Sequence, residues 1–294
     1  MRRPLRKLST GERLAALAGV AAAVAALVGF IPGLYRDTRP LVIQSHGQDV
    51  ATLVLALPVL ALALWAASRG SIRGRLVVLG ALGYLLYPYA IFAFDAVLNP
   101  ATPLYIAVVG LAVWSFALSM PRIAEIEVEA TVGDRVWRRA SSVFRLVIAG
   151  IFALLWLSQI ARAAITGQQP QALRDSGWPT SPIYVLDLAL LVPLCVVIGI
   201  RLLARRPGAL RFAVPLLVFI PILALGVLSI TAFVALDGQP FGFVEGGLFA
   251  VSTVVGGVLA WLALDPRPRA EEAARNEDRP PVTPTLDSRR HASG

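Results

Sequence analysis

Long apolar blocks, repeated along the chain, restrict most strongly what this sequence can fold into. A helix needs about 20 mostly apolar residues to cross the hydrocarbon core of a bilayer. Eight blocks approach or exceed that length: residues 14–35, 50–68, 76–96, 104–120, 144–166, 183–203, 212–235 and 242–264. Because the blocks are continuously apolar and do not alternate, they predict membrane-spanning helices and not the strands of a barrel.

The composition agrees with a membrane protein. Hydrophobic residues make up 57% of the chain and charged residues only 15%, whereas soluble domains carry about a quarter. We therefore predict an all-α bundle of about eight transmembrane helices that forms one domain over residues 1–264. Residues 265–294 are rich in proline and charge, which predicts a disordered cytoplasmic tail. The connection 121–144 fits a small hairpin, an interfacial helix or a charged tether.

The positive charge is distributed as in an integral membrane protein. The net charge is +9, and all but four of the 27 Lys and Arg residues fall at the termini or in alternate connections. Basic residues gather on the cytoplasmic side of membrane proteins, so we predict that both termini are cytoplasmic. The same distribution argues against binding to nucleic acid and makes the lipid bilayer the expected partner. The four exceptions are Arg36, Arg39, Arg162 and Arg174.

The residues that usually hold metals and cofactors are scarce. Cys195 is the only cysteine, so neither a disulfide within the chain nor a thiolate cluster is possible. His46 is the only histidine outside the tail, which excludes a histidine-rich zinc site. Phosphate-loop, dinucleotide and G-x-S-x-G motifs are absent. We predict no cofactor and no metal, with a carboxylate site around His46 for a hard cation as the remaining alternative.

Four predicted spans carry an ionisable residue near the end that faces outward. Charged side chains in a membrane tend to face a bundle interior or a water-filled cavity. In the stretch PIYVLDLALLVPLCVV, Asp187 lies about one turn inside an otherwise apolar block. Since these residues share one level of the bilayer, we predict an outward-facing polar pocket. The ionisable residues are Asp95, Arg162, Asp187 and Glu245.

Polar neighbours enlarge this predicted pocket. Tyr84 and Tyr87 share a helical face with Asp95, and Gln159 precedes Arg162 by three residues. The run QSHGQD is predicted to lie in the first outer loop, where Asp49 would be the N-cap of the second span. The alternative is that Asp187 only pairs with Arg162 at the membrane interface. The predicted ligand-binding residues are Asp187, Asp95, Arg162, Glu245, Tyr84, Tyr87, Gln159, His46 and Asp49.

Three stretches resemble a group of bacterial multi-pass integral membrane proteins to which no reaction is assigned. They are RDTRPLVIQSHGQD, GYLLYPYAIFAFDAVLNPATPLYIAVVGLAVWSFAL, and SPIYVLDLALLVPL with the basic turn RRPGALR after it. The resemblance covers most of the chain from the first outer loop to the seventh span. It implies a multi-pass protein of the bacterial plasma membrane, and it draws attention to Asp95, Asp187 and QSHGQD.

Three classes of function remain open from the sequence. The first is a small-solute transporter or permease-like protein whose outer carboxylates bind substrate or protons. The second is a non-catalytic membrane sensor or accessory subunit that binds a small molecule on the extracytoplasmic side, or a protein partner. The third is a membrane-embedded enzyme that acts on a lipid-linked substrate, with Asp187 or Asp95 as general base.

Overall fold

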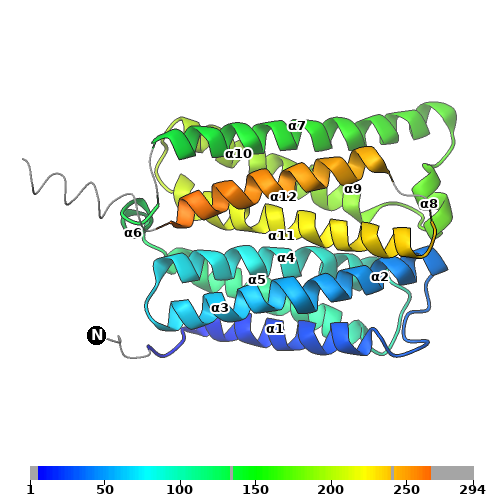
Figure 1. The fold of residues 1–294 in the computed structure, drawn as a ribbon, viewed down its shortest axis with the longest axis horizontal. Coiled ribbons are helices and arrows are strands. Elements are labelled where there is room, and N and C mark those ends of the chain that lie inside the picture. The colour runs from blue at the N-terminus through cyan, green and yellow to red at the C-terminus, as the bar shows by residue number, and fades with distance from the viewer. Residues whose placement is uncertain (1–5, 133–134, 240–241, 266–294) are drawn as a thin grey trace, which may run out of the picture. The chain divides into compact units, whose positions relative to one another are not determined.

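The computed structural model describes residues 6–132, 135–239 and 242–265, without the side chains of 135–136 and 243–245. Helices and their connections account for these ranges, with no strand among them. Eight helical segments are long and apolar enough to cross a membrane, as a multi-pass membrane protein requires. The predicted all-α bundle of about eight spans is therefore confirmed (Figure 1).

The spans follow the chain in simple order, and two of them are interrupted. The first span is α1 (Thr10–Val28), and the second runs through α2 (Arg39–Ala51), a π-helical turn η1 (Thr52–Ala56) and α3 (Leu57–Ser68). The third to fifth are α4 (Ile72–Asp95), α5 (Thr102–Ser119) and α7 (Arg135–Thr166). The sixth runs through α9 (Pro182–Leu186), a π-helical turn η3 (Asp187–Leu191) and α10 (Val192–Leu203). The last two are α11 (Ala209–Leu236) and α12 (Phe243–Leu264).

Short helices lie at the two ends of the bundle. The turn η2 (Met120–Arg122) and α6 (Glu125–Glu129) are at one end, and α8 (Gln171–Ser176) is at the other (Figure 1). These are named here the α6 end and the α8 end. No strand occurs in the described part of the connection 121–144, so the hairpin alternative is wrong. The connection instead packs against the α6 end of the bundle through Val128 and Val132, which are fully buried.

The helices α4 and α11 form the centre of the bundle and pack against each other. In both α4 and α11, two thirds of the most apolar stretch is buried inside the protein, which is more than in any of the other spans. Their close approach depends on Gly80, where a Cβ atom would come within 2.6 Å of the Val218 side chain. In Figure 1, α1 and α7 lie on opposite sides of this central pair. The bundle therefore has an inner layer that other spans surround.

The two interrupted spans share a local sequence pattern. Each π-helical turn ends two residues before a proline, Pro58 in the second span and Pro193 in the sixth. Proline lacks an N–H group, and its ring displaces the carbonyl one turn earlier, so the regular ladder cannot pass through it. The wider turn restores a bond: the N–H of Leu57 reaches the carbonyl of Thr52, and that of Val192 reaches Asp187. Such turns are frequent at functional sites.

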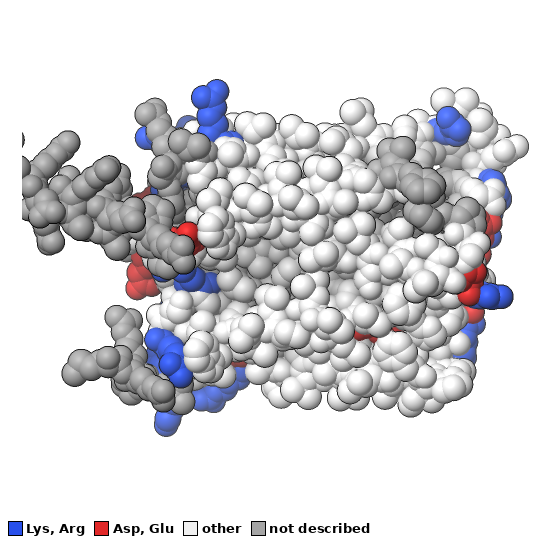
Figure 2. Space-filling model, viewed as in Figure 1, with Lys and Arg blue, Asp and Glu red and all other residues white. Residues whose placement is uncertain are grey.

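The sides of the bundle are apolar. In Figure 2, charged side chains gather at the two ends of the face in view, and the band between them is almost entirely uncharged. Many large apolar side chains are exposed on the sides of the bundle, among them Val20, Leu62 and Leu154. Contiguous exposed apolar surface of this extent is the surface that hydrocarbon chains cover. The charged ends and the apolar band thus mark the membrane plane.

Candidate functional site

A cavity of about 390 Å³ lies inside the bundle towards the α8 end. Residues of α2, α4, α7, α9, η3, α10, α11 and α12 line it, and α8 contributes Ala172, Leu173 and Ser176. The spans α1 and α5 contribute none. The lining is mostly apolar and aromatic, and Asp187 is its only acidic residue among those described. The cavity is large enough for a small organic molecule.

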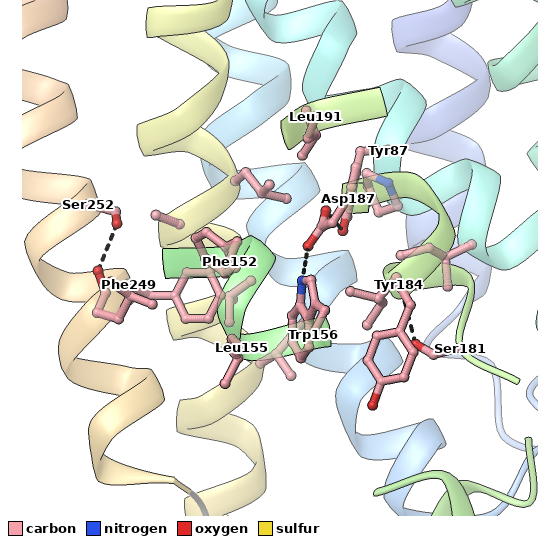
Figure 3. A pocket seen from close by; sticks show the side chains of 18 of the residues that line it. Tyr87, Phe152, Leu155, Trp156, Ser181, Tyr184, Asp187, Leu191, Phe249 and Ser252 are labelled. Atoms are coloured by element: carbon pink, nitrogen blue, oxygen red, sulfur yellow. Dashed lines mark hydrogen bonds between the residues drawn. The ribbon is translucent and has the colours of Figure 1, made fainter. Parts of the chain in front are cut away.

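Asp187 is the polar centre of this cavity. Only 6% of the residue is exposed, and it lies in the first position of the π-helical turn η3. The hydroxyl of Tyr87 donates a hydrogen bond to its Oδ1 at 2.7 Å, and the indole N–H of Trp156 donates to its Oδ2 at 2.7 Å. Figure 3 shows the bond from Trp156. The two donors come from α4 and α7, so the carboxylate joins three spans.

Both donors to Asp187 are neutral side chains. Its shortest polar contacts include no Lys, Arg or His, and no described cation forms an ion pair with it. A buried carboxylate usually has a cationic partner, because an isolated charge is costly to remove from water. A carboxylate oxygen also has room for more than one donor. Asp187 is therefore held in place by neutral donors and is paired with no described cation.

A second pair of side chains extends the polar wall. The hydroxyl of Tyr184 donates to the side-chain oxygen of Gln159 at 2.7 Å, and the rings of Tyr184 and Trp156 lie 5.2 Å apart between centroids. Ser181 caps α9 by accepting a hydrogen bond from the N–H of Tyr184. The cap fixes where the sixth span begins, and it therefore sets the position of Asp187 about a turn further on.

The connection between α7 and α9 covers the cavity at the α8 end. Leu173 and Ser176 of α8 are buried, and Gly177 ends α8 with a positive φ of 74°, which favours glycine. Trp178 follows and also lines the cavity. Its buried indole N–H has no hydrogen-bond partner among the described residues. Buried donors of this kind are rare, and an occupant of the cavity would explain one.

A buried arginine lies beyond the opposite limit of the cavity. Arg145 is fully buried, and its guanidinium donates to the hydroxyl and the carbonyl of Ser141 and to the carbonyl of Ala213. Along α7 it precedes Trp156 by eleven residues, or about 16 Å of helix rise. Cys195, which is also buried, lines the cavity on this side. Arg145, the only buried cation in the described part of the chain, is therefore bound by neutral groups and does not line the cavity.

A second buried carboxylate lies outside the cavity, in α2. Asp49 is 2% exposed and accepts a hydrogen bond at 2.7 Å from the hydroxyl of Tyr35. Burial, together with the nearby Asp49 carboxyl group, raises the pKa of Tyr35 far above its usual range, so its hydroxyl remains a donor. His46 stacks on Phe30 at 5.4 Å between ring centroids. This cluster ties the connection after α1 to α2.

The prediction for the start of the second span was wrong. QSHGQD does not form a loop, since α2 begins at Arg39 and all six residues are helical. Asp49 is consequently not an N-cap, and its side chain points into the protein. Gly47 packs against α11, where a Cβ atom would come within 2.7 Å of the Cα of Ile230. Gln48 lines the cavity and donates to the hydroxyl of Tyr84 at 2.6 Å.

The structure brings together only part of the predicted pocket. Asp187, Tyr87 and Gln159 line the cavity. Tyr84 is fully buried behind Gln48, and His46 and Asp49 belong to the cluster around Tyr35. Asp95 ends α4 away from the cavity, Arg162 is exposed, and the side chain of Glu245 lies outside the described residues. The ion pair between Asp187 and Arg162 is not formed.

The sequence interpretation did not identify three residues of interest: Tyr35, Arg145 and Trp178. Arg145 had a visible signal, because it lies just inside the fifth apolar block. Tyr35 and Trp178 had none, since aromatic residues near span ends are common at the membrane interface. Comparison with protein-family models, with curated proteins and with solved structures finds no match for this chain, so the chemistry of the cavity carries the functional conclusion.

Proposed function

We propose that this protein is a small-solute transporter of the bacterial plasma membrane and that the cavity around Asp187 is its solute-binding site. The observation that carries the proposal is a buried carboxylate, without a cationic partner, on the wall of a cavity of about 390 Å³ inside a membrane bundle. Ionisable residues within spans commonly mark the pathways of solutes and ions. The unpartnered N–H of Trp178 supports an occupant of the same cavity.

The π-helical turns support a functional role for the cavity. Such turns are irregularities within a continuous helix and are frequent at functional sites. Here one begins at Asp187 itself in the sixth span, and the other begins at Thr52 in the second span, next to Gln48 and the cavity. In the proposed orientation, both termini are cytoplasmic and the α8 end faces outward, because Lys and Arg are concentrated at the α6 end.

Uptake into proteoliposomes tests transport directly. The panel consists of small neutral, anionic and cationic solutes that each carry an apolar body. Val227 lines the cavity from α11, and Val227→Trp would place an indole ring in the cavity and narrow it, whereas Leu225→Trp changes a 38% exposed position of the same helix. In vesicles that contain the wild type or Leu225→Trp, we expect at least one solute to enter faster than it enters protein-free vesicles. In vesicles that contain Val227→Trp, we expect no such increase.

The same experiment separates a transporter from a sensor. A solute that binds the native state raises its apparent melting temperature. If a solute stabilises the wild type and none on the panel enters the vesicles, transport is refuted and ligand sensing is supported. If Val227→Trp takes up solute as fast as the wild type, the cavity is not the pathway.

A further inference from the structure

We propose that the occupant of the cavity is a small organic cation, an ammonium group on an apolar body, with Asp187 as its counter-ion. This inference rests on the proposed function, because it names the class of solute that the same site takes. It follows from three properties of the cavity wall: its charge, the geometry at the carboxylate and the placement of aromatic rings.

The charge of the wall has one sign. Asp187 is the only acidic residue among the described lining residues, and that set contains no Lys, Arg or His. Arg145, the nearest buried cation along α7, is bound by Ser141 and Ala213 outside the cavity. A carboxylate in a low-dielectric cavity is stabilised by a cation and opposed by an anion. Anionic solutes are therefore excluded, and neutral solutes gain nothing from the charge.

The carboxylate is fixed and still has acceptor capacity. An ionised carboxylate offers about four lone-pair positions. Tyr87 uses one on Oδ1, and Trp156 uses one on Oδ2. The two bonds hold the group in a single orientation, so a bound ammonium would find a preorganised acceptor. Hydrogen bonds from neutral donors also keep the negative charge available, which a salt bridge with arginine would cancel.

Aromatic rings surround the carboxylate. Trp156 and Tyr184 lie beside it, and Phe152 and Phe249 continue the wall with their centroids 5.6 Å apart (Figure 3). The face of an aromatic ring attracts a cation, most strongly where water is excluded, and the same rings bury an apolar body. A wall of this kind around a single carboxylate matches a molecule with a cationic head and an apolar body.

The test compares three probes that share one apolar body: 4-phenylbutylammonium, 4-phenylbutanol and 4-phenylbutyrate. Binding to the full-length protein in detergent is measured by calorimetry, and transport is measured in proteoliposomes. We expect the cation to bind at least about tenfold more tightly than the alcohol, and the carboxylate more weakly than both. If the wild-type protein binds the cation and the alcohol with equal affinity, or prefers 4-phenylbutyrate, the proposal is overturned by that measurement alone.

Two substitutions assign the preference to Asp187. Asp187→Asn keeps the size of the side chain and should bring the cation to within about threefold of the alcohol, while the affinity for the alcohol stays the same. Asp187→Glu keeps the charge and should retain the order of the three probes. Melting curves with the alcohol identify any variant that is merely unfolded. A preference for the cation that survives in Asp187→Asn refutes the counter-ion role.

Acidification gives an independent measurement. The titratable groups that face Asp187 are Tyr87 from α4, Tyr184 from α9 and Cys195 from α10, and α2, α7, α11 and α12 present only neutral described side chains. None of these three takes up a proton as the solution becomes acidic. Weaker binding of the cation at low pH, with unchanged binding of the alcohol, therefore reports protonation of Asp187. Affinity for the cation that does not change with pH contradicts the proposal.

The two proposals fail in different ways. If the cation binds as described and does not cross the membrane, the transport function is refuted and the assignment of ligand class stands. If the neutral probe enters faster with wild type than in protein-free vesicles or with Val227→Trp, and the cation does not bind, transport stands and the ligand class is refuted.

Discussion

The contact between α2 and α11 at Gly47 gives the most direct test of the fold around the cavity. A Cβ atom at this position would lie 2.7 Å from the Cα of Ile230 and 3.1 Å from the carbonyl oxygen of Ser229. Both are backbone atoms, so no flexible side chain can move aside. We expect Gly47→Ala to separate the helices and to cost about 1–3 kcal/mol by overpacking. Alanine's better helix propensity offsets at most about 1 kcal/mol of this.

The matched control is Gly257→Ala in α12, because no atom lies within 4 Å of the added methyl group. This variant should gain stability from the higher helix propensity of alanine, without any loss from overpacking. The assay is equilibrium unfolding of the purified proteins in mild detergent, followed by tryptophan fluorescence. We expect Gly47→Ala to be less stable than Gly257→Ala by about 1–3 kcal/mol. Equal stability would mean that Gly47 does not pack against α11, as if QSHGQD formed the outer loop that its polarity suggests.

Three further predictions test other parts of the structure. Tyr35→Phe leaves the buried Asp49 carboxyl group without its hydroxyl donor and should lower the free energy of unfolding by about 1–3 kcal/mol; adding Asp49→Asn should recover part of that loss. Trp137→Phe removes an indole N–H that donates to a carbonyl of α12 at 2.7 Å, and unfolding should show a loss of about 1 kcal/mol. The orientation can be tested in a variant that lacks the native cysteine, with a thiol reagent that cannot cross the membrane. The reagent should label Gln168→Cys in intact cells and Glu127→Cys only after permeabilisation. The reverse pattern would invert the proposed orientation.

Hydropathy identifies the number and class of the spans because a bilayer imposes length and composition on each one. It fails at α2 for a physical reason. Ser45, Gln48 and Asp49 are polar, yet each is buried against protein and not exposed to lipid. The side chains of Gln48 and Asp49 form hydrogen bonds with Tyr84 and Tyr35, which belong to other segments of the chain. A helix turn that faces protein can therefore have the composition of a loop.

The candidate site, like the fold, can be predicted from the sequence only in part. The cost of a charge in a membrane identifies Asp187 from the sequence alone, and the cavity does lie beside it. Helical spacing places Tyr84 and Tyr87 near one another on α4 and cannot say what each one contacts. In the structure Tyr84 binds Gln48 of α2, whereas Tyr87 binds Asp187 of η3. These choices depend on how three spans rotate against each other, which no local pattern records.

The missing ion pair has the largest consequence for function. The sequence offers Arg162 as a partner for Asp187, since both lie near the α8 end of adjacent spans. The structure leaves Arg162 exposed and places two neutral donors, Tyr87 and Trp156, on the carboxylate. An arginine paired with the carboxylate would have held it in place and neutralised its charge at once. Neutral donors separate these two effects: they fix the position of the carboxylate and leave its charge for a proton or a cation that enters the cavity.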